Sequence, residues 1–139
     1  MRKRTMRMGI SWIIIVGVVI IIGMQIYTMQ MRRDNRKGLT EELNKYGSQA
    51  MQYYMTPSDE KGGGTKSFSA LALNKYLEFR SNLKHTKQGV YLLRVSQDST
   101  IVTIIGTGLY PGKDKQHPIR ATLTVAPVTP TPLLIETNN

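Results

Sequence analysis

The pattern of hydrophobic and polar positions opens with one long apolar run. Residues 10–26 read ISWIIIVGVVIIIGMQI without a charge, and apolar side chains continue loosely to Met31. A bilayer core needs ~20 residues of helix, and the run reaches that length once its interfacial ends, Trp12 and Tyr27, are included. Isoleucine and valine disfavour helix in water, but in lipid the backbone must satisfy its own hydrogen bonds. The run therefore predicts a transmembrane helix.

Two other interpretations of this run are a secretory signal peptide and a buried segment of a soluble core. A secretory signal peptide would also begin with basic residues, but this run is long for one, and no small-x-small cleavage site follows it. A buried helix or strand of a soluble core would not carry strongly basic flanks on both sides.

After Lys37 the apolar positions recur at spacings of three and four, which is typical of one helical face. They are Leu39, Leu43, Tyr46, Ala50 and Tyr53. The polar residues between them are expected on the outer surface: Glu41, Glu42, Asn44, Lys45 and Gln49. Gly38 and Gly47 each weaken a helix by ~1 kcal/mol, so bends are expected there, and Pro57 should end the helix. One bent helix over 10–55 would be about 70 Å long.

The remaining residues predict an antiparallel α+β head. A turn-rich loop covers 56–64, and Ser67 or Ser69 can cap a helix over 68–83. That helix should bury one face, made of Phe68, Ala72, Tyr76, Phe79 and Leu83, with Leu73 and Leu77 beside it and Asn74, Lys75, Glu78 and Arg80 facing away.

β-Branched and alternating residues predict strands at 90–96, 100–107 and 119–125, separated by a turn at 97–99 and a loop over 108–118. The proline-rich stretch 127–132 should place Leu133-Leu134-Ile135 as an edge strand or a contact.

These elements give the fold class: a long N-terminal helix packed on a small antiparallel β-meander with one short extra helix. The expected divisions are a basic leader over 1–9, a transmembrane and stem helix over 10–55, and the head over 56–139.

The net charge of +10 is unevenly distributed along the chain. Residues 1–9 carry +4, residues 31–37 carry +3, and the rest of the chain carries only +3. Most of the excess therefore flanks the apolar run, where basic side chains suit an anionic lipid surface. This placement favours a membrane over a nucleic acid as partner. Because the first flank is the richer, we expect the N-terminus in the cytoplasm and the head outside.

The glycine triplet Gly62-Gly63-Gly64 raises the question of a phosphate cradle. A Walker A loop needs Gly-x-x-x-x-Gly-Lys-Ser/Thr after a strand. Here Thr65 precedes Lys66-Ser67, the preceding segment is helical, and Asp59 and Glu60 would repel a phosphate. The triplet is instead expected to be a flexible connection that turns the chain sharply back off the stem.

No catalytic or metal-binding constellation is evident in the sequence. The chain has no cysteine, and nothing brings His85, His117, Asp98 and Asp114 together. His85 is expected at the basic end of a helix and His117 in a loop, and no calcium-loop spacing is present. Tyr53-Tyr54 could stack on a nucleic-acid base, but packing of stem on head is favoured. We expect no enzyme activity, cofactor, metal or small-molecule substrate.

The order of basic leader, glycine and apolar helix resembles type IV pilins and the pseudopilins of type II secretion. The resemblance implies cleavage by a leader peptidase between Gly9 and Ile10. The fifth residue of the mature chain would be Ile14, where these families usually have glutamate. More narrowly, Tyr53-Tyr54 with Pro57, then the glycine triplet with Ser67-Phe68, is similar to a set of bacterial pilin-like proteins without an established enzymatic role.

The resemblance implies a structural subunit in the bacterial inner membrane, assembling with copies of itself or with other pilin-like subunits. Its heads would lie outside the membrane and could form an extracellular filament. The expected assembly positions are Ile13, Ile14, Gly17, Ile20 and Ile21. Two rivals stay open. One is a solitary single-pass protein with a small extracytoplasmic binding head, which Ile14 favours slightly. The other is an anchored enzyme, which no residue pattern supports.

Overall fold

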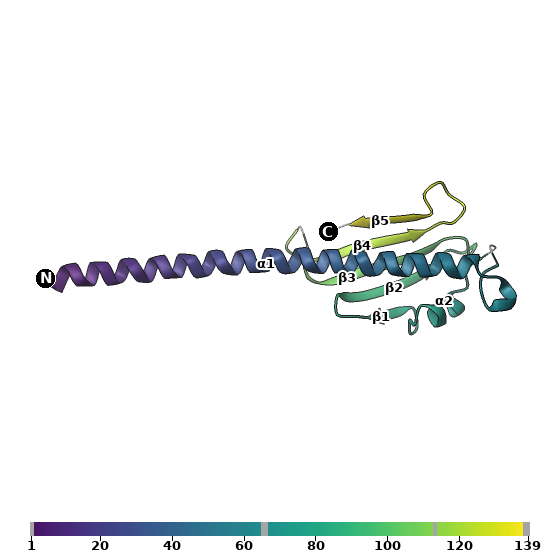
Figure 1. Ribbon diagram of the computed structural model, residues 1–139, viewed down its shortest axis with the longest axis horizontal. Helices are drawn as coiled ribbons and strands as arrows, with labels where there is room; N and C mark the ends of the chain where they lie inside the picture. The colour runs from purple at the N-terminus through teal and green to yellow at the C-terminus, as the bar shows by residue number, and fades with distance from the viewer. Residues whose placement is uncertain (1, 65–66, 113, 138–139) are drawn as a thin grey trace.

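One straight helix joins the N-terminus to the far end of the head (Figure 1). The computed structural model describes residues 2–64, 67–112 and 114–137, with side chains described from Ile13 onward apart from Ser58. The elements are α1 (Arg2–Met55), the 3-10 helix η1 (Ser58–Glu60), α2 (Ala70–Tyr76), β1 (Leu83–His85), β2 (Gly89–Val95), β3 (Val102–Pro111), β4 (Pro118–Val125) and β5 (Leu133–Thr137).

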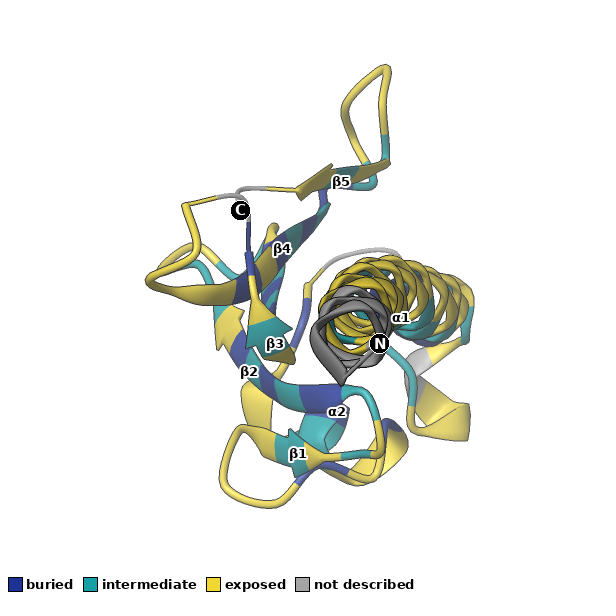
Figure 2. Ribbon diagram, turned by 90° about the vertical axis from the view of Figure 1, so that its left-hand side faces the viewer, coloured by how far each residue is buried: buried dark blue, intermediate teal, exposed yellow. Residues whose placement is uncertain are grey.

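The five strands form one antiparallel meander in the order β1-β2-β3-β4-β5. Its concave face lies against α1, which Figure 2 shows end-on beside the sheet. Alternation decides which face is inward: Ile119, Ala121, Leu123 and Val125 of β4 are all fully buried, as their spacing predicts. The predicted α+β layout of a long helix, a short helix and an antiparallel sheet is therefore confirmed.

The C-terminal half of α1 supplies one side of the core. Leu39, Leu43, Tyr46, Ala50 and Tyr53 are each at most 4% exposed, so the predicted stem face is confirmed. The helix ends at Met55, just before Pro57.

The predicted bends at Gly38 and Gly47 are wrong, because α1 is continuous through both. The two glycines serve close approach instead. A Cβ at Gly38 would lie 2.4 Å from Gln88 Cδ, and one at Gly47 would lie 3.1 Å from side chains of Leu123 and Leu133. Packing against the head offsets the helical cost of glycine.

The prediction of one helix over 68–83 is wrong in its second half. Ser69 caps α2 as expected, accepting from Ala72 N at 3.4 Å, but the helix stops at Tyr76. Glu78, Ser81 and Asn82 then adopt positive φ, and an Asn74–Asn82 side-chain hydrogen bond of 2.7 Å closes the turn.

The early end of α2 also changes which side chains it buries. Leu73 and Leu77 are buried, whereas Tyr76, expected inward, is 41% exposed. Asn74, expected to face away, is half-buried. Residues 83–85 pair with β2 as strand β1, so His85 lies in a strand and not at a helix end.

The other strands follow the prediction with shifted ends. Strand β3 begins at Val102 and runs on to Pro111, through the first part of the loop expected at 108–118. Leu133-Leu134-Ile135 belong to β5, which pairs with β4 at the edge of the sheet. Of the two alternatives for this segment, the edge strand is therefore correct.

The glycine triplet folds back over the C-terminal end of α1. Gly63 N donates to Tyr53 O at 2.9 Å and Gly64 N to Thr56 O at 2.9 Å, satisfying carbonyls that a helix end leaves unpaired. A Cβ at Gly62 would lie 2.2 Å from Thr56 O. The predicted reversal is confirmed, and its glycines form a compact hydrogen-bonded cap. Thr65 and Lys66 lie outside the described residues.

Candidate functional site

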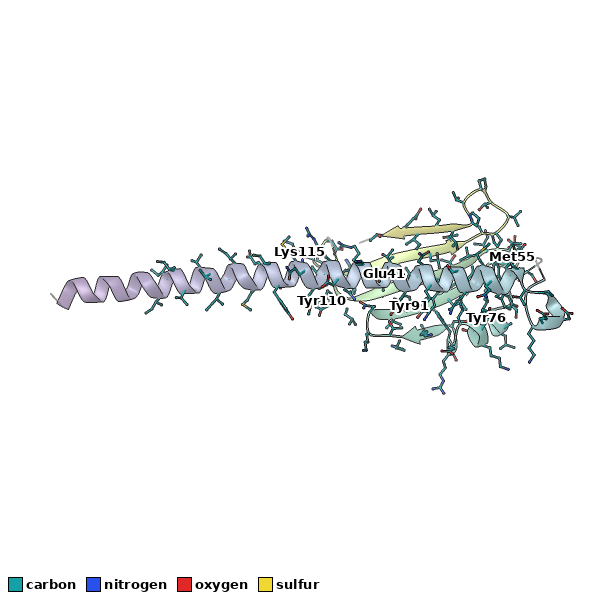
Figure 3. The ribbon with its side chains drawn as sticks, in the orientation of Figure 1. Glu41, Met55, Tyr76, Tyr91, Tyr110 and Lys115 are labelled. Atoms are coloured by element: carbon teal, nitrogen blue, oxygen red, sulfur yellow. The ribbon has the colours of Figure 1, made fainter. Side chains whose placement is uncertain are left out.

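The N-terminal half of α1 carries apolar side chains that no other element covers. From Ile13 to Met29 the large apolar residues are all at least half exposed, with Ile13 at 73%. Figure 3 shows side chains projecting above and below the helix before it reaches the sheet. Within the described residues, one helix is long and apolar enough to cross a membrane, with a mean hydropathy of 2.1 in its apolar window. Contiguous apolar surface of this extent marks contact with lipid or with protein.

The five expected assembly positions share one side of this segment. At ~100° per residue, Ile13, Ile14, Gly17, Ile20 and Ile21 fall within about 120° of arc, with Gly17 near its centre. A Cβ built at Gly17 would meet nothing within 4 Å apart from its chain neighbours and the adjacent helix backbone, so the space over this glycine is open. Gly9 and Ile10, the expected cleavage positions, lie within α1, and their side chains are outside the described set.

Asn35 ties the base of the head to α1. Its side chain is 4% exposed. Nδ2 donates to Gln88 O at 2.7 Å and to Gln88 Oε1 at 3.3 Å, while Oδ1 accepts from Leu109 N at 3.0 Å. One amide thus holds the start of β2 and the end of β3 at a fixed position along the helix. No sequence pattern predicts this role for Asn35, whose one signal is an uncharged amide inside a basic run.

Replacing Asn35 with alanine should lower the free energy of unfolding by about 1–3 kcal/mol, because Leu109 N–H and Gln88 C=O lose their partner at a partly buried contact. Denaturant unfolding of the full chain in mild detergent measures the change. Asn44→Ala, an exposed position on the same helix, is the matched control and should stay within about 0.5 kcal/mol. Equal effects of the two variants would show that the Asn35 hydrogen bonds do not stabilise the head on α1.

A second polar contact joins the middle of α1 to the sheet. Glu42 Oε2 accepts from Tyr91 Oη in a short hydrogen bond and from Thr86 Oγ1 at 2.7 Å. Glu42 was expected on the outer surface; it is half-buried, and that prediction is wrong. Burial raises the pKa of Tyr91 above its usual range, helped by the hydrogen bond and charge of Glu42. Burial, and then the Glu42 charge, raise the pKa of Tyr46 to about 12.

These shifts predict loss of stability at high pH. The folded protein holds the Tyr46 proton more tightly than the unfolded chain, whose tyrosine titrates near 10.0. The resulting stabilisation is complete below pH 10 and is lost as pH rises through about 12. Unfolding free energies measured across this window should fall with pH, and Tyr46→Phe should make the fall shallower. Parallel slopes for the two proteins would show that Tyr46 does not contribute.

The candidate catalytic side chains are spread over separate elements. His85 lies in β1, Asp98 in the turn before β3, and Asp114 and His117 in the loop between β3 and β4. The structure does bring the last two together: His117 Nδ1 lies 2.7 Å from Asp114 Oδ2, at the surface. Hydrogen bonds from Ser96 and Thr100 lower the pKa of Asp98. Among the described residues, no group of three or more His, Cys, Asp or Glu side chains could hold a metal ion.

The far end of the head carries an aromatic cluster beside a shallow groove. Tyr53 and Tyr54 are buried against Phe68, with ring centroids 6.3 and 5.2 Å apart, which confirms their packing role. The groove has a volume of about 570 Å³ and is lined by Tyr53, Lys61, Gly62, Ser69, Leu71, Ala72, Lys75 and Tyr76. Leu71 is 84% exposed there. The surface is mostly apolar, and two lysines are among its lining residues.

Comparison with known proteins adds no relative: no family model, curated protein or solved structure matches the chain. Three features of the structure bear on the function. They are the exposed apolar half of α1, the polar contacts that fix the head on the same helix, and the groove at the far end.

Proposed function

We propose that the protein is a membrane-anchored, pilin- or pseudopilin-like structural subunit of the bacterial inner membrane. The observation that carries the proposal is the continuity of α1, which is exposed and apolar in one half and forms the core of an antiparallel head in the other. The exposed half suits a bilayer or a bundle of like helices. Heads built directly on such helices would surround a helical core when copies assemble.

The assembly face is the side of α1 centred on Gly17. Isoleucines at positions 13, 14, 20 and 21 flank this glycine, and small residues let helix backbones approach closely in lipid. The opposite side of the helix, near Val19, is filled by β-branched side chains. We therefore propose that neighbouring subunits meet over Gly17.

The chain has no cysteine, so single cysteines can report on this face. Ile20→Cys on the face and Val19→Cys on the opposite side lie at nearly the same depth. Oxidation in native membranes should give disulfide dimers of the first variant at a several-fold higher yield than the second.

The mass of the purified chain tests the expected leader cleavage, since cleavage by a leader peptidase would leave Ile10 at the N-terminus.

The alternative function is a solitary single-pass protein whose head binds an extracytoplasmic partner. Ile14 in place of the usual glutamate supports it, as does the groove at the far end with Leu71 exposed beside two lysines. A chain that keeps Met1 and forms no dimers through any cysteine of the apolar segment would favour this alternative. It would also count against a subunit role.

A further inference from the structure

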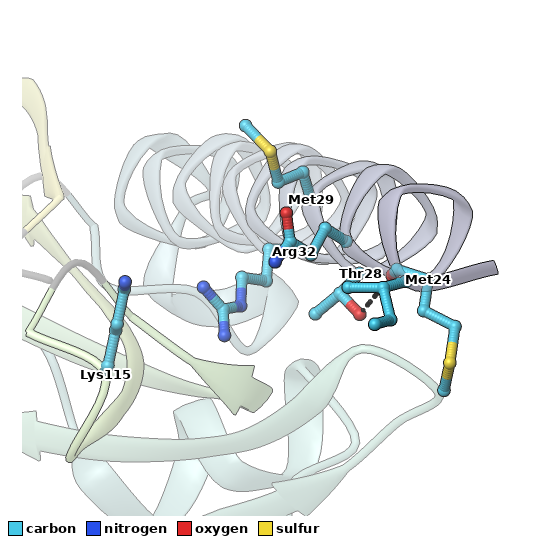
Figure 4. A pocket seen from close by; sticks show the side chains of 7 residues that line it. Met24, Thr28, Met29, Arg32 and Lys115 are labelled. Carbon is cyan, nitrogen blue, oxygen red and sulfur yellow. Dashed lines mark hydrogen bonds between the residues drawn. The ribbon is translucent and has the colours of Figure 1, made fainter. Parts of the chain in front are cut away.

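A groove lies where the apolar half of α1 meets the head (Figure 4). Its volume is about 610 Å³, and it opens between the helix and the loop that joins β3 to β4. Arg32 and Lys115 stand at the end near the head. The rest of the lining comes from α1 alone: Ile21, Met24, Gln25, Thr28 and Met29.

The groove is cationic at the end near the head, and its other lining residues are apolar apart from Gln25 and Thr28. Ile21 and Arg32 are separated by about 16 Å at ~1.5 Å per residue. One leaflet of a bilayer has a hydrocarbon layer of about 15 Å, half of the ~30 Å core. If Arg32 lies at the headgroups, Ile21 therefore lies near the bilayer midplane, and the groove has the length and polarity of one phospholipid.

Lys115 is held in position by its loop. Asp114 Oδ1 accepts from the backbone N–H groups of Gln116 and His117 at 3.0 Å each, and Lys115 N donates to Gly112 O at 3.1 Å. These contacts keep Lys115 in a left-handed conformation, with φ of 61°. The loop thereby places a lysine opposite the helix, at the end of the head shown in Figure 3.

Arg32 completes the cationic end. Figure 4 shows its side chain extending from α1 toward the loop that carries Lys115. Its Nε atom is buried and has no hydrogen-bond partner within the described residues. A smaller adjoining hollow of about 190 Å³ is lined by Met29, Arg32, Arg33, Arg36 and Gly112, which adds positive charge. Asp34 is two residues from Arg32, which places it ~200° around the helix, away from the groove.

We infer that this groove binds one anionic phospholipid of the leaflet on the head's side of the membrane. The phosphate lies between Arg32 and Lys115, and an acyl chain lies along Ile21, Met24 and Met29. The guanidinium group suits bidentate contact with phosphate oxygens. The apolar part of the groove fits an acyl chain, which a lipid has and free phosphate lacks. The inference rests on the membrane anchoring in the proposed function.

Native mass spectrometry of the full chain in detergent tests this site, with phosphatidylglycerol and phosphatidylcholine of identical acyl chains as probes. The unaltered protein should retain phosphatidylglycerol preferentially. The variant Arg32→Gln with Lys115→Gln should bind it roughly 25-fold more weakly, at about fivefold for each basic residue near an anionic lipid. Arg32→Lys with Lys115→Arg keeps both charges and should retain most of the affinity.

The matched control is Lys45→Gln with Arg94→Gln, which removes one lysine and one arginine from exposed positions on α1 and β2. It should bind phosphatidylglycerol as the unaltered protein does. Equal binding of the two lipids, or equal weakening by the control, would overturn the site. Displacement by glycerol 3-phosphate as effective as by lipid would assign the groove to a free phosphate.

Failure of this inference differs from failure of the proposed anchoring. A protein that fractionates with membranes but shows no lipid preference contradicts only the lipid site. A protein recovered in the soluble fraction contradicts the anchoring and, with it, the lipid site.

Discussion

Replacing Leu43 with alanine should lower the free energy of unfolding of the head by about 2–5 kcal/mol. Leu43 is 0% exposed and belongs to the apolar cluster between α1 and the sheet. Truncating it removes transfer free energy and leaves a cavity that packed neighbours fill only in part. Typical domains are stable by about 5–15 kcal/mol, so this change removes a large part of the total. Denaturant unfolding of the full chain in mild detergent, followed by circular dichroism, measures it.

Leu71→Ala is the matched control, because it makes the same chemical change at a side chain that is 84% exposed. Its effect should stay within about 0.5 kcal/mol. If Leu43→Ala were as mild as Leu71→Ala, α1 would not supply the core of the head.

Replacing Val19 with arginine should shift the protein out of the membrane. Val19 is 63% exposed and lies near the middle of the apolar run. Valine slightly favours the centre of a bilayer, whereas arginine disfavours it by about 2.5–3.5 kcal/mol. The ratio of membrane-integrated to alkali-extractable protein should therefore fall roughly a hundredfold, at tenfold for each ~1.4 kcal/mol.

Met29→Arg is the control for this change. Met29 lies three residues before Arg32, at the edge of the apolar run, where an arginine can extend its charge to the headgroups. It should leave the ratio nearly unchanged. If arginine changes this ratio at neither position, the segment does not anchor the protein.

The elements that the sequence predicts well are those decided by local period. Leu39 to Tyr53 recur every three or four residues, and each buries the side that this spacing indicates. The alternation in β4 is equally clear. The apolar helix, the cap after Pro57 and the order of helix and strands follow from similar short-range patterns.

The misses arise where distant partners override a local pattern. Leu83 continues the helical spacing of residues 68–79, but it pairs with Leu92 of β2 and ends as a strand residue. Glu42 looks like an outer residue of the stem until Tyr91, 49 residues later, donates to it. Asn35 bonds to groups 53 and 74 residues away. No window of neighbouring residues contains such partners, so the polar contacts of the stem could not be predicted.

The unbroken path of α1 has a mechanical consequence. The helix is about 80 Å long at ~1.5 Å per residue, and it runs from the apolar segment to the far end of the head without a hinge. The strands of the head run roughly along its axis (Figure 1). Tension between the far end of the head and the apolar end of α1 therefore loads helix and sheet together in shear. Under tension, the head and α1 should therefore behave as one stiff unit, and the head should not swing on a flexible linker.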